Sequence, residues 1–258
     1  MSGVVLFGGL DVAELVFYLF MLFFLGLVIY LRREDRREGY PLEDDIGGRL
    51  YPNDALLQTG GPKSFRLPHG RGTVTIPHGR RDPVDVANAR RTSVFAGSPL
   101  EPTGNPLASG VGPAAFAQRA DVPDLDWEGH PRIVPIGLAG DFFVTKRDAD
   151  PRSLRIVGAD GVVAGKVSDL WIDRSDRLIR YLAVDLTGGG VALAPMAMCW
   201  IDRRRGVVVC DALHGAQFAG APIPASADRI TLLEEEKILG WFGGGYLYAH
   251  PSRSEPKL

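Results

Sequence analysis

The most constraining feature of the sequence is an apolar run near its amino terminus. Residues 12–31 are VAELVFYLFMLFFLGLVIYL, and no charged residue lies between Leu15 and Leu31. At a rise of about 1.5 Å per residue, a helix of this length spans about 30 Å, the thickness of the hydrocarbon core of a bilayer. The run is apolar on all sides, unlike an amphipathic surface helix. We therefore predict a single transmembrane helix over residues 12–31.

Two other interpretations of this run are a buried core helix and a cleaved signal peptide. Core helices are usually shorter and less uniformly apolar. A signal peptide carries basic residues before its apolar run, whereas residues 1–10 carry no charge here. The basic residues follow the run instead, at Arg32, Arg33, Arg36 and Arg37. By the positive-inside rule, we expect residues 1–11 on the outer side of the membrane and the chain after Arg32 in the cytoplasm.

Charge and cysteine content exclude two classes of protein. Lys+Arg number 29 and Asp+Glu 31, for a formal net charge of −2, and a nucleic-acid binder would need a basic surface. The two cysteines, Cys199 and Cys210, have no C-x-x-C spacing. They are too few for the disulfide framework of a small secreted domain.

Proline dominates the segment that follows the apolar run. Eleven of the 19 prolines lie within residues 32–130, so this segment should contain no long helix and no central strand. The composition allows either a disordered linker or an extended chain that is ordered by contact with another surface. Apolar residues favour the second alternative, namely Phe65, Leu67, Val74, Ile76, Val94, Phe95 and Phe116.

Residues 131–250 predict a small β-rich domain. Short strands are expected at 154–157, 162–172, 179–186, 191–194 and 207–210, separated by Gly- and Asp-rich turns. Such strands are typical of a small antiparallel sheet closed into a barrel. A helix should begin after Thr231, with Glu234 completing a capping box, and end at the glycines 243–245. The fold class is therefore α+β and membrane-anchored, with residues 251–258 as a tail.

The sequence contains no recognisable catalytic set. It has no G-x-S-x-G, no P-loop and no H-E-x-x-H, so we expect neither an enzyme nor a metal or cofactor site held by this chain alone. One acidic cluster stands out in a Pro-containing loop, at Asp121, Asp124, Asp126, Glu128 and His130. It is either a solvated loop or a proton-collecting surface, because carboxylates and imidazole titrate between about pH 4 and 7. A second group, Asp169, Asp173 and Asp176, surrounds a turn, where turn chemistry alone explains Asp.

Several stretches of the chain resemble, in order, the H subunit of the purple-bacterial photosynthetic reaction centre. They are LRREDRREGYPL at 31–42, FRLPHGRGT at 65–73, PTGNP at 102–106, GVGPA at 110–114, AGKVSDLW at 164–171, TLLEEEKI at 231–238 and GGYLYA at 244–249. The resemblance implies that residues 32–130 are ordered against partner subunits and that residues 131–250 form a PRC-barrel domain in the cytoplasm. It also implies an inner (intracytoplasmic) membrane with residues 1–11 in the periplasm.

The resemblance further implies a function and a set of partners. The H subunit holds no pigment or quinone of its own. It stabilises the L and M subunits on their cytoplasmic side and helps to conduct protons to the secondary quinone. The complex is then expected to carry bacteriochlorophyll, bacteriopheophytin, quinones and a non-haem iron, and to contact membrane lipid but no nucleic acid. A cytochrome subunit and a light-harvesting antenna are further possible partners.

The same resemblance suggests roles for individual residues. Asp126, Glu128 and His130 fall at the family's site of proton uptake. Asp173 and Asp176 fall at its interior acidic positions near the secondary quinone, with Arg180 as a nearby basic partner. Two positions depart from the family pattern: Glu128 stands where some relatives have His, which should weaken a transition-metal inhibitory site, and Arg229 replaces an acidic residue, which makes that side branch of the proton path doubtful.

Two alternatives to this function come from other classes of protein. A membrane-tethered PRC-barrel binding module that recruits a soluble partner would explain the barrel, but not the matches at 31–42 and in the Pro-rich segment. A membrane-anchored hydrolase lacks any nucleophile and base. We therefore expect a non-catalytic subunit of a light-driven electron-transfer complex.

Overall fold

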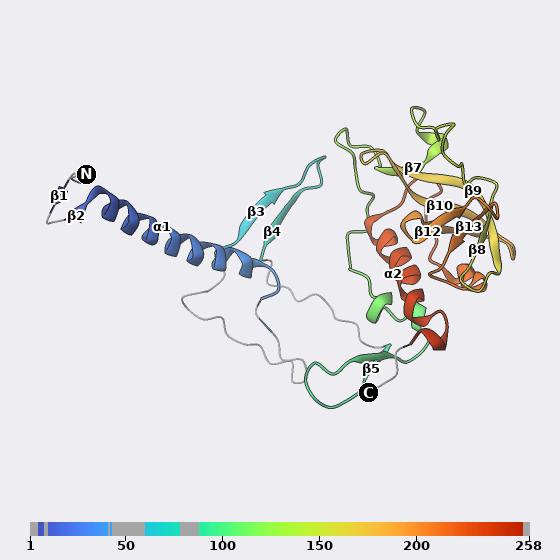
Figure 1. The fold of residues 1–258 in the computed structure, drawn as a ribbon, viewed down its shortest axis with the longest axis horizontal. Coiled ribbons are helices and arrows are strands. Elements are labelled where there is room, and N and C mark those ends of the chain that lie inside the picture. Colours follow the sequence, from blue (N-terminus) through green and yellow to red (C-terminus); the bar gives the residue numbers. More distant parts are fainter. Residues whose placement is uncertain (1–4, 8–9, 41, 43–59, 78–87, 255–258) are drawn as a thin grey trace. The chain divides into compact units, whose positions relative to one another are not determined.

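A computed structural model describes residues 5–7, 10–40, 42, 60–77 and 88–254. The chain divides into two compact units (Figure 1). The first comprises Met1–Val84 and Val94–Ser98, and the second comprises Asp85–Ser93 and Pro99–Leu258. Each unit is described by itself.

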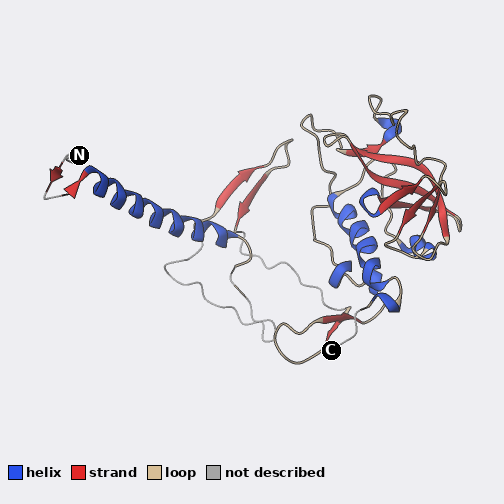
Figure 2. Cartoon of the chain, viewed as in Figure 1, coloured by secondary structure: helices blue, strands red, loops and turns tan. Residues whose placement is uncertain are grey.

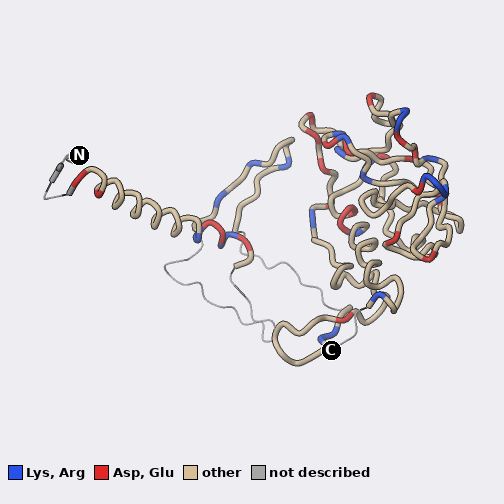
Figure 3. Tube along the Cα trace, viewed as in Figure 1, with Lys and Arg blue, Asp and Glu red and all other residues tan. Residues whose placement is uncertain are grey.

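The first unit is built on the apolar helix α1 (Val12–Glu34), which continues into the 3-10 turn η1 (Asp35–Arg37). Asp11 caps the helix and Glu14 completes a capping box. None of its residues is buried, and Figure 3 shows no charged residue along its central turns. The expected helix over 12–31 is confirmed, and it extends to Glu34 because Arg and Glu are good helix formers. By length and composition, α1 is able to cross a membrane.

Short antiparallel hairpins accompany α1. Strands β1 (Val5–Phe7) and β2 (Leu10–Asp11) pair before it. After it, β3 (Lys63–Arg66) pairs with β4 (Thr73–Ile76). Glu34 at the end of α1 lies 2.6 Å from Lys63 of β3 and 2.9 Å from Arg37. These ion pairs tie the end of α1 to the β3–β4 hairpin.

The described parts of the Pro-rich segment are mostly extended, as expected. In the second unit they form a hairpin of β5 (Ala89–Arg91) and β6 (Leu100–Pro102). The 3-10 turns η3 (Pro106–Ala108) and η4 (Gly112–Ala114) follow, and both lie against the C-terminal helix. Pro41, Pro52 and Pro83 lie outside the described residues.

One twisted sheet forms the body of the second unit. Its strands are β7 (Ile133–Pro135), β8 (Arg155–Val157), β9 (Val163–Asp173), β10 (Leu178–Leu186), β11 (Val191–Pro195), β12 (Cys199–Asp202) and β13 (Val207–Cys210). They follow the order β11-β10-β9-β8-β13-β12, and β7 pairs with β9. Short 3-10 turns connect them, namely η5 (Ile136–Leu138), η6 (Met196–Met198) and η7 (Gly215–Gly220).

Two details of the sheet differ from the expected antiparallel barrel. β8 and β13 run parallel, and strands β9 to β12 lie between them along the chain. Among residues 88–254, no ladder joins the edge strands β11 and β12, although η6 connects them directly along the chain. The five expected strands are all present within about two residues of their predicted bounds, whereas β7 and β12 are strands that the sequence analysis did not predict.

The C-terminal helix α2 (Leu232–Tyr248) packs beside this sheet (Figure 2). Thr231 caps it and Glu234 completes the capping box, as predicted. The predicted end of the helix at residues 243–245 is wrong. These glycines lie within the helix, where they allow close contact with neighbouring segments. A Cβ atom at Gly244 would lie 2.8 Å from the Cβ of Ala114, and one at Gly245 would lie 2.2 Å from the carbonyl oxygen of Ala212. The helix therefore continues to Tyr248 and is followed by η8 (Pro251–Arg253).

Strand β10 is buried on both faces. The sequence pattern placed Leu182, Val184 and Leu186 on one face, and the first two are fully buried. Tyr181 and Ala183 on the opposite face are also buried. The hydroxyl of Tyr181 donates a hydrogen bond to Glu235 of α2. Helix α2 thus contacts the face of β10 that carries Tyr181, which the alternating apolar pattern of the sequence assigned to solvent.

Candidate functional site

Strand pairing brings the two acidic clusters of the sequence together. β7 pairs with the end of β9, with Ile133 opposite Asp173 and Val134 opposite Ile172. The backbone N–H of Arg174 donates to the carbonyl oxygen of Arg132, at 2.9 Å. The loop of residues 121–132, which carries the first cluster, is therefore held against the turn that carries the second.

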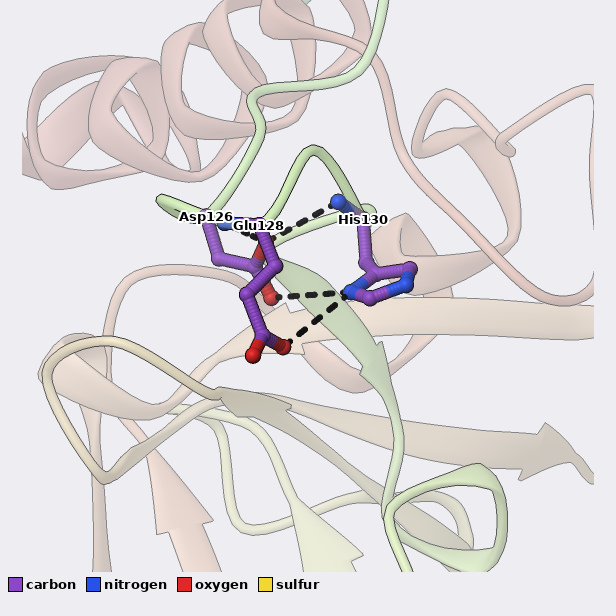
Figure 4. Close-up of side chains that lie close together, drawn as sticks. All are labelled: Asp126, Glu128 and His130. Atoms are coloured by element: carbon purple, nitrogen blue, oxygen red, sulfur yellow. Dashed lines mark hydrogen bonds and ion pairs between the residues drawn. The ribbon is translucent and has the colours of Figure 1, made fainter.

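The first cluster, which we call the surface cluster, consists of Asp126, Glu128 and His130 (Figure 4). The Nδ1 atom of His130 lies 3.5 Å from the Glu128 carboxylate and 3.7 Å from that of Asp126. Glu128 and His130 are about half exposed, with 47% and 57% of their side-chain surface accessible, whereas Asp126 is buried. Two exposed titratable groups therefore stand over one buried carboxylate.

Asp126 is fixed by the backbone of its own loop. Its Oδ1 accepts hydrogen bonds from the N–H groups of Glu128, at 3.0 Å, and His130, at 2.9 Å. Its other oxygen lies 3.5 Å from Arg174. Burial alone would raise the pKa of Asp126, but the two N–H donors and the nearby His130 and Arg174 outweigh it, so the pKa lies below its usual value.

The second cluster, which we call the inner cluster, consists of Asp173, Asp176 and Arg132. Asp173 is 1% exposed and accepts hydrogen bonds from the N–H groups of Ser175 and Asp176, both at 2.9 Å. The Nε of Arg132 lies 2.9 Å from the same carboxylate. The two terminal nitrogens of Arg132 contact Asp176, at 2.5 Å, and Asp124, at 3.3 Å.

Arg132 thus joins three carboxylates from two separate segments. Its hydrogen bond to Asp173 is the main reason that its pKa is raised above the usual value, and the charges of Asp173 and Asp176 add to it. The guanidinium therefore stays charged, and its planar set of donors suits several carboxylates at once. The sequence analysis missed Arg132, because no local motif marks it and only the β7–β9 pairing places it beside Asp173.

Arg180, expected near Asp173 and Asp176, forms its ion pair with another carboxylate. Arg180 lies 3.5 Å from Glu235 of α2, and Arg132 takes the expected place beside the two aspartates. Glu235 is buried and also accepts the hydroxyl of Tyr181, at 2.9 Å. Burial raises the pKa of Glu235, while the bonds from Tyr181 and Arg180 act against it. Arg180 on β10 therefore anchors α2 to the sheet.

The remaining charged residues of the sequence analysis lie around these clusters. Asp121 accepts the hydroxyl of Thr231 at 2.7 Å, which ties the loop to the start of α2. Asp169 accepts the N–H of Leu170, at 2.8 Å. Arg229 is exposed and lies 3.9 Å from Asp228. Turn and loop chemistry accounts for these contacts.

The surface cluster also has the geometry of a weak cation site. The nearest ligand atoms of Asp126, Glu128 and His130 lie within 4.8 Å of one another. Two carboxylates and one imidazole are suitable ligands for a divalent ion. Exposure of two of the three residues favours exchange with solvent over tight binding.

Two protein-family models match the chain. The photosynthetic reaction centre H-chain N-terminal region matches residues 4–138, just over half of the chain, and the PRC-barrel domain matches residues 143–217. The chain belongs to the photosynthetic reaction centre H-chain family. The surface cluster and Arg132 of this H chain lie in the first match, whereas Asp173, Asp176 and Arg180 lie in the second. The ion pairs of Arg132 therefore connect the two family regions.

Membership of this family carries consequences for the H chain as a whole. The family is a non-enzymatic subunit of a complex with pigments and quinones, and it associates with the L and M subunits. The apolar helix α1 fits membrane anchoring. The expected family and fold class are thereby confirmed.

Proposed function

We propose that this H chain stabilises the L and M subunits on their cytoplasmic side and conducts protons to the secondary quinone. The observation that carries the proposal is the β7–β9 pairing, which holds the loop of the surface cluster against the turn of the inner cluster, with Arg132 bound to Asp173 and Asp176. A proton relay needs titratable groups in a nearly continuous series, with one end in water. The surface cluster supplies that end, and the inner cluster lies next to it.

Each predicted residue has a role in this proposal. Glu128 and His130 collect protons from solvent because they are half exposed, and Asp126 is the buried group beneath them. Asp173 and Asp176 pass protons toward the quinone, and Arg132 balances their charge. Arg180 acts indirectly, by holding Glu235 and α2 in place.

The anchor and the Pro-rich segment support the assembly half of the proposal. Residues 12–31 would cross the inner membrane, with residues 1–11 in the periplasm and the rest in the cytoplasm. Residues 32–130 would lie on the L and M subunits and residues 131–250 would form the cytoplasmic barrel. Exposed apolar side chains in this segment, such as Phe65, Val94 and Phe95, suit such a contact.

The proposed complex has further components. Its other subunits would hold bacteriochlorophyll, bacteriopheophytin, quinones and a non-haem iron. A cytochrome subunit and an antenna are additional proposed partners. A tethered PRC-barrel module that recruits a soluble partner is disfavoured, because the H-chain model matches the first half of the chain as well.

Flash spectroscopy of the purified complex tests the relay. The double variant Asp173→Asn/Asp176→Asn should slow the second, proton-coupled electron transfer to the quinone by about tenfold or more. The first transfer should change less, because it need not bind a proton directly. Asn keeps the size and the turn preference of Asp, and the absorption spectrum verifies assembly. The double effect should be less than the sum of the single effects if both residues serve one path.

Asp169→Asn is the matched control for this experiment. Asp169 also lies on β9, but its side chain accepts a hydrogen bond from the neighbouring backbone N–H and belongs to neither cluster, so its variant should show both transfers at the wild-type rate. An unchanged second transfer in the double variant would remove the inner cluster from the relay.

Protease protection tests the proposed orientation. Protease added to inside-out membrane vesicles should remove most of the H chain and leave a fragment that contains α1. Protection there, with digestion in right-side-out cells, would reverse the topology.

A further inference from the structure

The only two cysteines of the chain lie directly opposite each other. Cys199 begins β12 and Cys210 ends β13, and the two residues are partners in the antiparallel ladder of this hairpin. Opposed residues in such a ladder point to the same face, with Cβ atoms about 4.5–5.5 Å apart. Both cysteines indeed face the core: Cys210 is fully buried, and Cys199 is partly buried against the same cluster. Little movement separates this arrangement from the spacing of a disulfide, about 3.5–4.5 Å between Cβ atoms.

The two thiols differ in their electrostatic surroundings. The neighbouring Cys199 thiol is the main reason that the pKa of Cys210 is lowered. Burial and the charge of Asp211 oppose this shift, while the N–H groups of Ala212 and Leu213 support it. The neighbouring Cys210 and burial raise the pKa of Cys199. Cys210 is therefore the thiol that ionises first, and Cys199 retains its proton.

We propose that Cys199 and Cys210 form a peroxide-sensitive dithiol that closes reversibly into a disulfide across the end of the β12–β13 hairpin. The Cys210 thiolate attacks one oxygen of hydrogen peroxide and the O–O bond breaks, leaving a sulfenic acid and a hydroxide that is protonated to water. The sulfur of Cys199 then loses its proton and attacks the sulfur of Cys210, and the S–O bond breaks to release a second water. Two electrons pass from the thiols to the peroxide. A low-molecular-weight thiol restores the reduced pair by exchange.

The position of the pair determines what the disulfide would do. Residues directly after Cys210 hold the C-terminal end of α2: Arg253 donates to the carbonyl oxygens of Asp211, at 2.7 Å, and Ala212, at 2.9 Å. Tyr246 donates its hydroxyl to the Asp211 carboxylate, at 3.1 Å. A covalent bridge at this point fixes the end of the hairpin on which α2 docks. Oxidation should therefore reduce local opening of this junction.

Peroxide treatment of the assembled complex tests the proposal. After incubation with hydrogen peroxide and acid quenching, free thiols are alkylated and the chain is examined by mass spectrometry. We expect an intrachain disulfide, lighter by two hydrogen atoms and reversed by dithiothreitol. It should form about tenfold or more faster in the folded chain than in the chain unfolded in denaturant, because the fold raises the effective concentration of the two thiols.

Two single variants separate the roles of the cysteines. Cys199→Ser should accumulate a sulfenic acid on Cys210 that dimedone traps, because the resolving thiol is absent. Cys210→Ser should react with peroxide much more slowly than the wild type. Two free thiols after treatment of the folded complex, or a disulfide that forms no faster than in the unfolded chain, would overturn the proposal.

Discussion

The surface cluster and the inner cluster each combine one buried carboxylate with partly exposed charged groups, and they differ in what binds that carboxylate. In the surface cluster, His130 lies 3.5 and 3.7 Å from two carboxylates, and two of the three side chains are about half exposed. In the inner cluster, Asp173 is 1% exposed and accepts two backbone N–H groups and a guanidinium, all at 2.9 Å. Sequence spacing alone does not reveal this difference. The buried Asp173 binds a guanidinium at 2.9 Å, whereas Arg174 and His130 lie 3.5 and 3.7 Å from the buried Asp126.

This contrast has an energetic consequence. Exposed ion pairs contribute little to stability, because water screens them and their side chains lose freedom. Removing one partner of a buried pair is costly, because it leaves a charge without compensation. The inner cluster should therefore matter more for stability than the surface cluster. The first of three predictions tests this order, and the other two examine the surface cluster.

The largest effect is expected from Arg132→Met. Loss of the guanidinium leaves the buried Asp173 carboxylate with only its two N–H donors, which should lower the free energy of unfolding by about 3 kcal/mol. Urea titration of the full chain in detergent measures this change. Arg174→Met is the matched control, because its ion pair with the buried Asp126 is longer, at 3.5 Å, and His130 remains beside that carboxylate. The control should lose about 1 kcal/mol or less, and equal losses would contradict the comparison.

The second prediction concerns inhibition of proton uptake by zinc bound at the surface cluster, where a smaller change in free energy is expected. Zinc should slow proton uptake by the wild-type complex only at high concentration, because the cluster offers one imidazole. Glu128→His adds a second imidazole, and a gain of about 1.4 kcal/mol would lower the zinc concentration for half inhibition about tenfold. Asp148→His, on an exposed loop, should leave zinc sensitivity unchanged. No change with Glu128→His would remove this cluster from proton uptake.

The smallest effect concerns pH and Asp126. Its pKa is lower in the folded chain than its usual value of 3.8, so the charged carboxylate stabilises the fold above about pH 4. This contribution is lost as the pH falls through the folded pKa. Asp126→Asn keeps an oxygen for the two N–H donors but removes the charge. The free energy of unfolding should be higher for the wild type than for the variant at pH 7, and this difference should become smaller as the pH falls to 3. A difference that widens there would show the opposite sign of linkage.

Much of the fold could be predicted because its signals are local. An uncharged run of helical length marks α1, and the Thr231–Glu234 capping box marks the start of α2. Gly and Asp turns separate strands β8 to β11 and precede β13. β7, which contains a proline, and β12, which follows the 3-10 turn η6 directly, escaped prediction. Such strands exist only because a neighbouring strand pairs with them.

The sequence by itself determined the anchor, the β-rich domain, the capped helix and the candidate acidic residues, since each depends on residues within a few positions of one another. Tertiary structure alone decided how those residues combine. The β7–β9 register places Arg132, rather than the expected Arg180, beside Asp173 and Asp176. The close approach of α2 to Ala114 and Ala212 makes packing sites of glycines that were expected to end the helix. Both outcomes depend on contacts between segments distant in the sequence, where no local propensity selects the partner.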